Sequence, residues 1–198
     1  MSPPKVLIPK EKVIEAGLEI VRNSGLNGLS ARAVSAKLGT SVGPIYRSCE
    51  SMDQLITAVL ESARELLQQY TSRSYTAMPF RNVGVGLVEF ARDEPNLYLA
   101  LFVERHHFRS IIREFCHDME ESLAGDETFQ TLAAAAREEL LLEMWTYAHG
   151  LAMFVISGLV EDATTEAINQ RIGRIGFAVI TAAFGGDTRW ALAQCPQE

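Results

Sequence analysis

Residues 29–48, LSARAVSAKLGTSVGPIYRS, constrain this chain most, because they predict two short helices joined by a tight turn. Ser30 is placed to cap the first helix, and Gly39 supplies the backbone freedom that ends it. Ser41 is placed to cap the second helix. Its first turn accepts Pro44, because helical N–H groups there have no partners within the helix. The pattern predicts a helix-turn-helix, whose second helix enters the major groove in DNA-binding proteins.

The rest of the chain shows the three-to-four-residue apolar spacing of amphipathic helices and no strand pattern. We expect an all-α fold of about nine helices, with a helix-turn-helix domain at 1–50 and a second domain at 51–198. The tail from residue 187 is expected to be loosely held. Outside the helix-turn-helix, helices are predicted at about 10–23, 51–74, 80–92, 97–104, 110–123, 128–160 and 165–184.

The formal net charge of −7 is unevenly divided along the 198 residues. Residues 1–50 carry seven Lys/Arg against four Asp/Glu, whereas residues 51–198 carry eleven against twenty-one. All four lysines (Lys5, Lys10, Lys12 and Lys37) precede residue 38. Positive charge is therefore concentrated where a phosphate backbone would be met, and the acidic remainder would repel DNA.

The order and spacing of these elements resemble the TetR family of transcriptional regulators over roughly residues 8–60. The matching pieces are Val13 to Val21, Ser24-Gly25, Ser30, Gly39, Ser41 to Arg47 and Leu55-Ile56. The resemblance implies an N-terminal helix-turn-helix domain and a C-terminal domain that binds an effector and dimerises. It also implies a repressor that binds a palindromic operator as a dimer and is released by a small organic ligand.

The DNA contacts follow from chemistry and from the resemblance. Tyr46 resembles the family's phosphate-binding tyrosine, and Arg32 resembles a position from which a guanidinium could bond guanine. The apolar start of the reading helix favours contact with thymine methyl groups and recognition of DNA shape. The family's lysine at the start of the fourth helix is missing, since Met52 stands there. The candidate DNA-binding residues are Lys10, Ser30, Arg32, Thr40, Ser41, Val42, Gly43, Pro44, Tyr46, Arg47 and Ser48.

The two long C-terminal helices carry apolar stripes and several small residues, so they are the expected dimer interface. The alternative is that both stripes are buried within their own domain. The candidate interface residues are Leu151, Val155, Leu159, Ile168, Ile172, Ile175, Val179 and Ala183.

The effector pocket is expected to take an amphipathic or aromatic organic molecule, because its candidate lining is mostly aromatic. The alternative is that many of these side chains belong to the core. The candidate lining is Leu66, Tyr70, Phe90, Tyr98, Phe102, Arg105, Phe108, Trp145 and His149.

Other function classes receive less support. His106, His107, Cys116, His117 and His149 suggest a transition-metal site, yet the neighbouring arginines would oppose a cation or clamp an acidic ligand instead. No catalytic or cofactor motif appears, so neither an enzyme nor a cofactor is expected. Three widely spaced cysteines and no signal peptide predict a cytoplasmic protein, and apolar runs of about ten residues are too short for a bilayer. The alternative function is a helical small-molecule or metal-sensing module with little specific DNA affinity.

Overall fold

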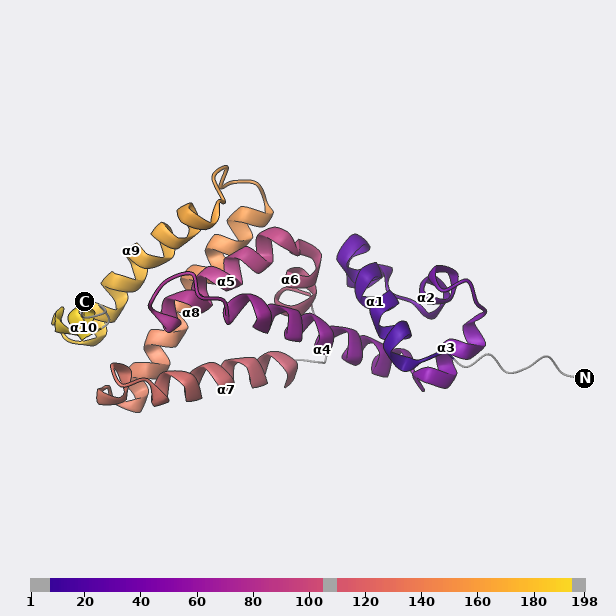
Figure 1. Ribbon diagram of the computed structural model, residues 1–198, viewed down its shortest axis with the longest axis horizontal. Helices are drawn as coiled ribbons and strands as arrows, with labels where there is room; N and C mark the ends of the chain where they lie inside the picture. The colour runs from indigo at the N-terminus through magenta and orange to yellow at the C-terminus, as the bar shows by residue number, and fades with distance from the viewer. Residues whose placement is uncertain (1–7, 105–109, 194–198) are drawn as a thin grey trace, which may run out of the picture. The chain divides into compact units, whose positions relative to one another are not determined.

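The computed structural model describes residues 8–104 and 110–193, and these residues form helices and turns without a strand (Figure 1). The all-α prediction is confirmed. The α-helices are α1 (Lys10–Ser24), α2 (Ala31–Lys37), α3 (Val42–Ser48), α4 (Met52–Thr71), α5 (Pro79–Asp93), α6 (Pro95–Phe102), α7 (Ser110–Gly125), α8 (Ala134–Ile156), α9 (Thr165–Ala183) and α10 (Arg189–Ala193). Two 3-10 turns, η1 (Leu26–Gly28) and η2 (Phe129–Thr131), complete them.

The chain divides into two compact units, each built from two stretches of sequence. The first unit comprises residues 1–66 and 94–112, and the second comprises 67–93 and 113–198. α4 contributes to both units, and α6 belongs with the helix-turn-helix. The functional boundary near residue 50 stays a prediction, because compactness alone does not assign function.

The first unit is organised around α1, which packs against α2, α3, η1 and α6. Gly17 permits a close approach within it, because a Cβ there would lie 2.6 Å from Cγ2 of Val59. Val13, Val34 and Ile45 are almost fully buried, so each of the first three helices contributes to one core.

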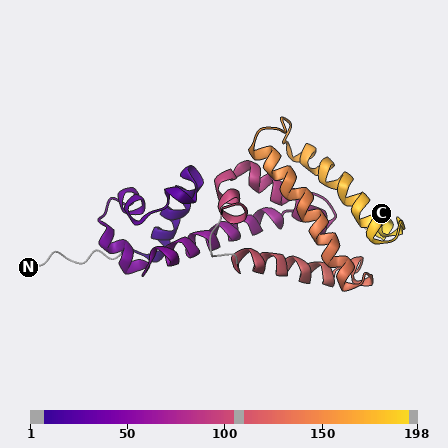
Figure 2. The ribbon, with the colours of Figure 1, turned by 180° about the vertical axis from the view of Figure 1, so that it is seen from behind.

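The second unit centres on α5, which packs against α8 and α9. Figures 1 and 2 show α8 and α9 side by side and joined by a short loop. Glu89 of α5 is only 3% exposed, and its carboxylate accepts hydrogen bonds from Arg92 at 3.3 Å and from the hydroxyl of Thr165. A buried carboxylate needs such partners, and the bond from Thr165 ties α5 to the start of α9.

Two details of the predicted helices are wrong. The helix expected at 128–160 begins at Ala134, because η2 occupies 129–131 and Ala133 is extended with φ −61° and ψ 150°. The tail beyond residue 187 contains α10, whose Trp190 is 7% exposed. The predicted end of α9 is confirmed, since Gly185 takes a φ of +65°. Among the described residues, no helix is both long and apolar enough to cross a bilayer.

Candidate nucleic-acid interface and effector cavity

The helix-turn-helix consists of α2, a turn at residues 38–41 and α3. Gly39, with a φ of +63°, ends α2 in the left-handed region that favours glycine. Its N–H donates to the carbonyl of Ala36 at 3.2 Å, and that of Thr40 donates to the carbonyl of Ser35 at 2.9 Å. This pair of bonds is a Schellman motif, which fixes the direction in which the chain leaves α2.

The two predicted caps have different outcomes. Ser30 caps α2, because its hydroxyl oxygen accepts the N–H of Ala33 at 3.1 Å. Ser41 has the extended backbone of an N-cap residue but makes no side-chain capping bond, so that prediction is wrong. Its side chain is exposed at the start of α3.

Several candidate DNA-binding side chains are exposed on the first unit. Tyr46 is 46% exposed, which is high for a large aromatic residue. Thr40 and Val42 are half-buried. The exposed candidates are Lys10, Ser30, Arg32, Ser41, Gly43, Tyr46 and Arg47.

Two candidates are engaged inside the unit instead. Pro44 is buried, which contradicts the prediction that it faces base edges. The hydroxyl of Ser48 donates to the carbonyl of Ile8 at 2.7 Å, and to the Pro44 carbonyl at 3.3 Å. Ser48 thus ties α3 to the segment that precedes α1.

Both positively and negatively charged side chains lie near α3. Lys37 forms an ion pair with Glu19 at 2.7 Å, so part of the positive charge is compensated within the unit. Glu50 and Asp53 are exposed at the start of α4, where the resemblance leads one to expect a lysine. Burial raises the pKa of Cys49 behind α3, so this thiol stays protonated at neutral pH.

The largest cavity described here has a volume of about 360 Å³ and lies within the second unit. Its walls are the end of α4 with residues 72–74, the start of α5, and α7. Phe80, Phe115 and Met119 supply an apolar surface, whereas Asp118 and Asp126 supply carboxylates. The lining therefore combines aromatic rings with two carboxylates and the guanidinium of Arg73.

Two further polar residues of this wall, Arg73 and Asn82, also make contacts within the protein. Arg73 lies over the ring of Tyr70 at 3.8 Å and within 3.6 Å of the Glu89 carboxylate. Asn82 accepts from the N–H of Thr76 at 2.8 Å and donates to its carbonyl at 3.0 Å. These contacts tie Arg73 and Thr76, which lie between α4 and α5, to the α5 side chains Glu89 and Asn82.

Comparison with known proteins agrees with this architecture. No family model matches the sequence. Over 58 residues the chain is 36% identical to the HTH-type transcriptional repressor DrrR1 of Streptomyces coeruleorubidus, a match that spans 29% of this chain and 22% of that repressor. A tetR-family transcriptional regulator from Streptomyces coelicolor superposes with a TM-score of 0.70 at 13% identity, over 93% of this chain and 86% of that one.

The fold is that of the TetR family. Two further solved structures support the assignment of the TetR fold. The regulator SCO7222, a TetR from Streptomyces coelicolor, has a TM-score of 0.65 and 18% identity over 90% of this chain and 99% of that one. The multidrug binding protein EbrR, complexed with malachite green, has a TM-score of 0.59 and 19% identity over 87% and 98%.

Within this TetR fold, the predicted effector residues do not form one group. Phe90 and Tyr98 are fully buried core residues, and they belong to different compact units. Trp145 lines a small apolar cavity of about 30 Å³, and Arg105 and Phe108 lie outside the described residues. Phe80, Phe115 and Asp118 were not predicted, because α5 and α7 are far apart in the sequence and only the tertiary fold brings these residues to one cavity.

The residues considered for the alternative of a transition-metal site do not assemble in the part of the chain that the structure describes. No group of three His, Cys, Asp or Glu side chains there is arranged to hold an ion. His106 and His107 lie outside the described residues. Desolvation lowers the pKa of His149, which favours its neutral form in the folded protein.

The candidate interface residues on α8, α9 and the loop between them differ in burial. Leu151, Ile168 and Ile172 are buried within the second unit, as the alternative interpretation expected. Val155, Ile175, Val179 and Ala183 are half-buried, and Leu159 is 73% exposed. Phe154 was not predicted, although it is 54% exposed on α8. The exposed apolar surface of these helices is thus carried partly by residues outside the predicted set.

Proposed function

We propose that the protein is a DNA-binding transcriptional regulator that acts as a dimeric repressor in the cytoplasm and is released by a small organic ligand. The observation that carries this proposal is an accessible α3 start, followed by Tyr46 and Arg47, on a chain with the TetR fold. An exposed helix start of this kind suits the major groove, and Tyr46 would fix the helix through a phosphate.

A dimer is part of the proposal, because one reading helix contacts only half of a palindrome. Phe154 and Leu159 give α8 and its following loop an exposed apolar surface that a second copy would cover. In a two-fold dimer this surface of one protomer would contact the same surface of the other protomer.

The proposed effector site is the 360 Å³ cavity. Its carboxylates and aromatic rings favour an aromatic cation, which would gain both electrostatic attraction and ring contacts. Malachite green, the dye named with EbrR, is a suitable first probe.

The test of DNA binding is fluorescence anisotropy with random-sequence and genomic fragments over a series of salt concentrations. Arg32→Ala and Tyr46→Phe are expected to weaken selective binding, the former by about tenfold if Arg32 contacts a base. Arg174→Ala is the matched control, because Arg174 is an exposed arginine on α9. Binding by the native chain should fall steeply with salt.

A second candidate function is a ligand-sensing module with little specific DNA affinity. Exposed Glu50 and Asp53 at the start of α4 favour it, since they would repel phosphates. Weak, non-selective binding that neither variant changes would support this module and contradict the repressor.

A further inference from the structure

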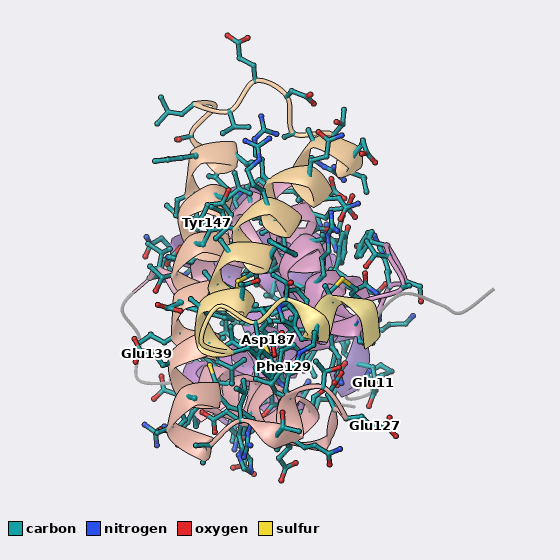
Figure 3. All side chains as sticks on the ribbon, turned by 90° about the vertical axis from the view of Figure 1, so that its left-hand side faces the viewer. Glu11, Glu127, Phe129, Glu139, Tyr147 and Asp187 are labelled. Atoms are coloured by element: carbon teal, nitrogen blue, oxygen red, sulfur yellow. The ribbon has the colours of Figure 1, made fainter. Side chains whose placement is uncertain are left out.

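A second cavity, of about 210 Å³, lies elsewhere in the second unit, between the start of α5, α8, α9 and α10. Figure 3 looks onto the side that carries α9 and α10, with Tyr147 and Glu139 labelled along α8. The lining is apolar apart from one charged side chain, that of Arg81. Phe80, Met144, Ile180 and Trp190 are among its apolar residues.

The guanidinium of Arg81 is bound on one side only. Its Nη2 donates to the carbonyl of Asn169 at 2.7 Å, whereas its Nε is buried without an acceptor. Among the residues that the structure describes, no carboxylate lies within ion-pair distance of Arg81. The cavity wall thus carries a partly buried positive charge whose donors are incompletely used.

Gly173 makes this position possible. A Cβ at residue 173 would overlap the guanidinium of Arg81, so the absence of a side chain lets the charged group lie flat against α9. The bond from Nη2 to the Asn169 carbonyl holds the guanidinium in this place beside the cavity, which lowers the entropic cost of recognising a ligand.

A buried charge is costly unless an opposite charge or several hydrogen bonds compensate it. A carboxylate in the cavity would supply that charge and could accept from more than one N–H of the guanidinium. The remaining lining would contact only an apolar body. Because a cavity of roughly 150 Å³ accepts benzene, about 210 Å³ has room for one ring and a carboxylate.

We propose that this cavity binds a small aromatic carboxylate, with the carboxylate on Arg81 and the ring between Phe80, Met144 and Trp190. The site is separate from the cavity proposed for the effector, although Phe80 lines both. It would select an anion, whereas the carboxylates of the larger cavity favour a cation.

The test compares phenylacetate with its neutral isostere phenylacetamide on the full chain, without DNA, by isothermal titration calorimetry. Phenylacetate is expected to bind about tenfold or more tightly, because only it can pair with the guanidinium. Arg81→Met should abolish this preference, and Arg174→Met should retain it. Arg81→Met is not expected to lower Tm, since replacing a poorly compensated charge by an apolar chain is often neutral or stabilising.

The position of bound phenylacetate is determined by NMR from the indole N–H resonances of the two tryptophans. The indole of Trp190, which donates to the hydroxyl of Thr181 at 3.2 Å, is assigned by its loss in Trp190→Phe. Phenylacetate should shift this resonance and leave that of Trp145 in place. Equal affinity for the two compounds, or an unmoved Trp190 resonance, would overturn the proposal. If Arg81→Met fails to fold, the comparison of the two compounds on the native chain still decides it.

Discussion

Glu94 accepts a hydrogen bond from the Nε–H of Arg22 at 2.7 Å, which joins the end of α1 to the start of α6. The side-chain amide of Asn96 adds a second bond, to the carbonyl of Arg22, at 2.9 Å. Through these contacts α6 is packed together with the helix-turn-helix. A displacement of α6 would therefore change the position of the end of α1.

Glu94→Gln is expected to destabilise the protein, because the carboxylate is 14% exposed and loses a charge-assisted bond. Arg22 is 39% exposed, so screening limits the loss to about 0.5–1 kcal/mol. Chemical unfolding at low and high salt measures this loss in the free energy of unfolding. Glu15→Gln, at an exposed position on α1, is the control. The same loss in both variants would refute a specific role for the pair.

Gly39→Ala is expected to cost about 1–2 kcal/mol, since an L residue is strained at a φ of +63°. Apart from the residue itself and its two chain neighbours, nothing lies within 4 Å of the Cβ that would be added, so the cost comes from the backbone conformation. Gly39→Asn should cost less, because asparagine tolerates this region better. Gly43→Ala, inside α3, should be neutral or stabilising. Denaturant midpoints check the order, and an unaffected Gly39→Ala would contradict it.

Gly86→Ala is expected to cost about 1–3 kcal/mol, because its Cβ would meet the backbone of Tyr70 and Thr71, which cannot move aside cheaply. Gly150→Ala is the matched helical control. No atom lies within 4 Å of its added Cβ, so helix propensity should make it stabilising by up to about 1 kcal/mol. The Tm values of the two variants in thermal unfolding measure this difference in stability. Gly86→Ala with a native Tm would mean that the helices are farther apart than described.

The pKa of His149 is expected to be below 6.5, because desolvation disfavours its charged form. Its neutral form then contributes stability that is present above pH 6.5 and is lost as the pH falls from there through the folded pKa. NMR titration of the imidazole, assigned with His149→Gln, measures the value directly. A value at or above 6.5 would show that His149 is more hydrated than the structure indicates.

Phe154→Glu and Leu159→Glu are expected to shift the protein toward monomers, because both residues lie on the proposed interface of α8 and its following loop. A charge placed in such a surface must be desolvated or exclude the partner. Sedimentation velocity over a range of protein concentrations gives the result. Val103→Glu, at a residue that is 44% exposed in the first unit, is the control. Unchanged sedimentation of both variants would place the interface elsewhere or show that none exists.

The helix-turn-helix could be predicted from sequence because its signals are local. Ser30 bonds a residue three positions away, and Gly39 ends α2 through its own φ. Pro44 was misjudged because periodicity gives a helix but not the side that faces the core. The start of α8 was missed because the Asp126 side chain accepts the N–H of Thr128 at 2.8 Å, which favours a turn before the helix.

The cavities could not be predicted in this way. The candidate lining was chosen by residue type, and aromatic residues such as Phe90 and Tyr98 are more often core than pocket. The observed walls depend on which faces of α4, α5 and α7 meet. Arg81 carries no local signal at all, since its burial depends on a glycine in another helix.

The contact between Arg81 and Gly173 also limits which residues evolution can place at position 173. A side chain at 173 would need the space that the guanidinium occupies, so a larger residue there would require Arg81 to leave its place against α9. Related chains with arginine at the equivalent of 81 should keep glycine at the equivalent of 173. Chains that have lost the arginine should be free to carry a larger residue there, and the two positions would covary.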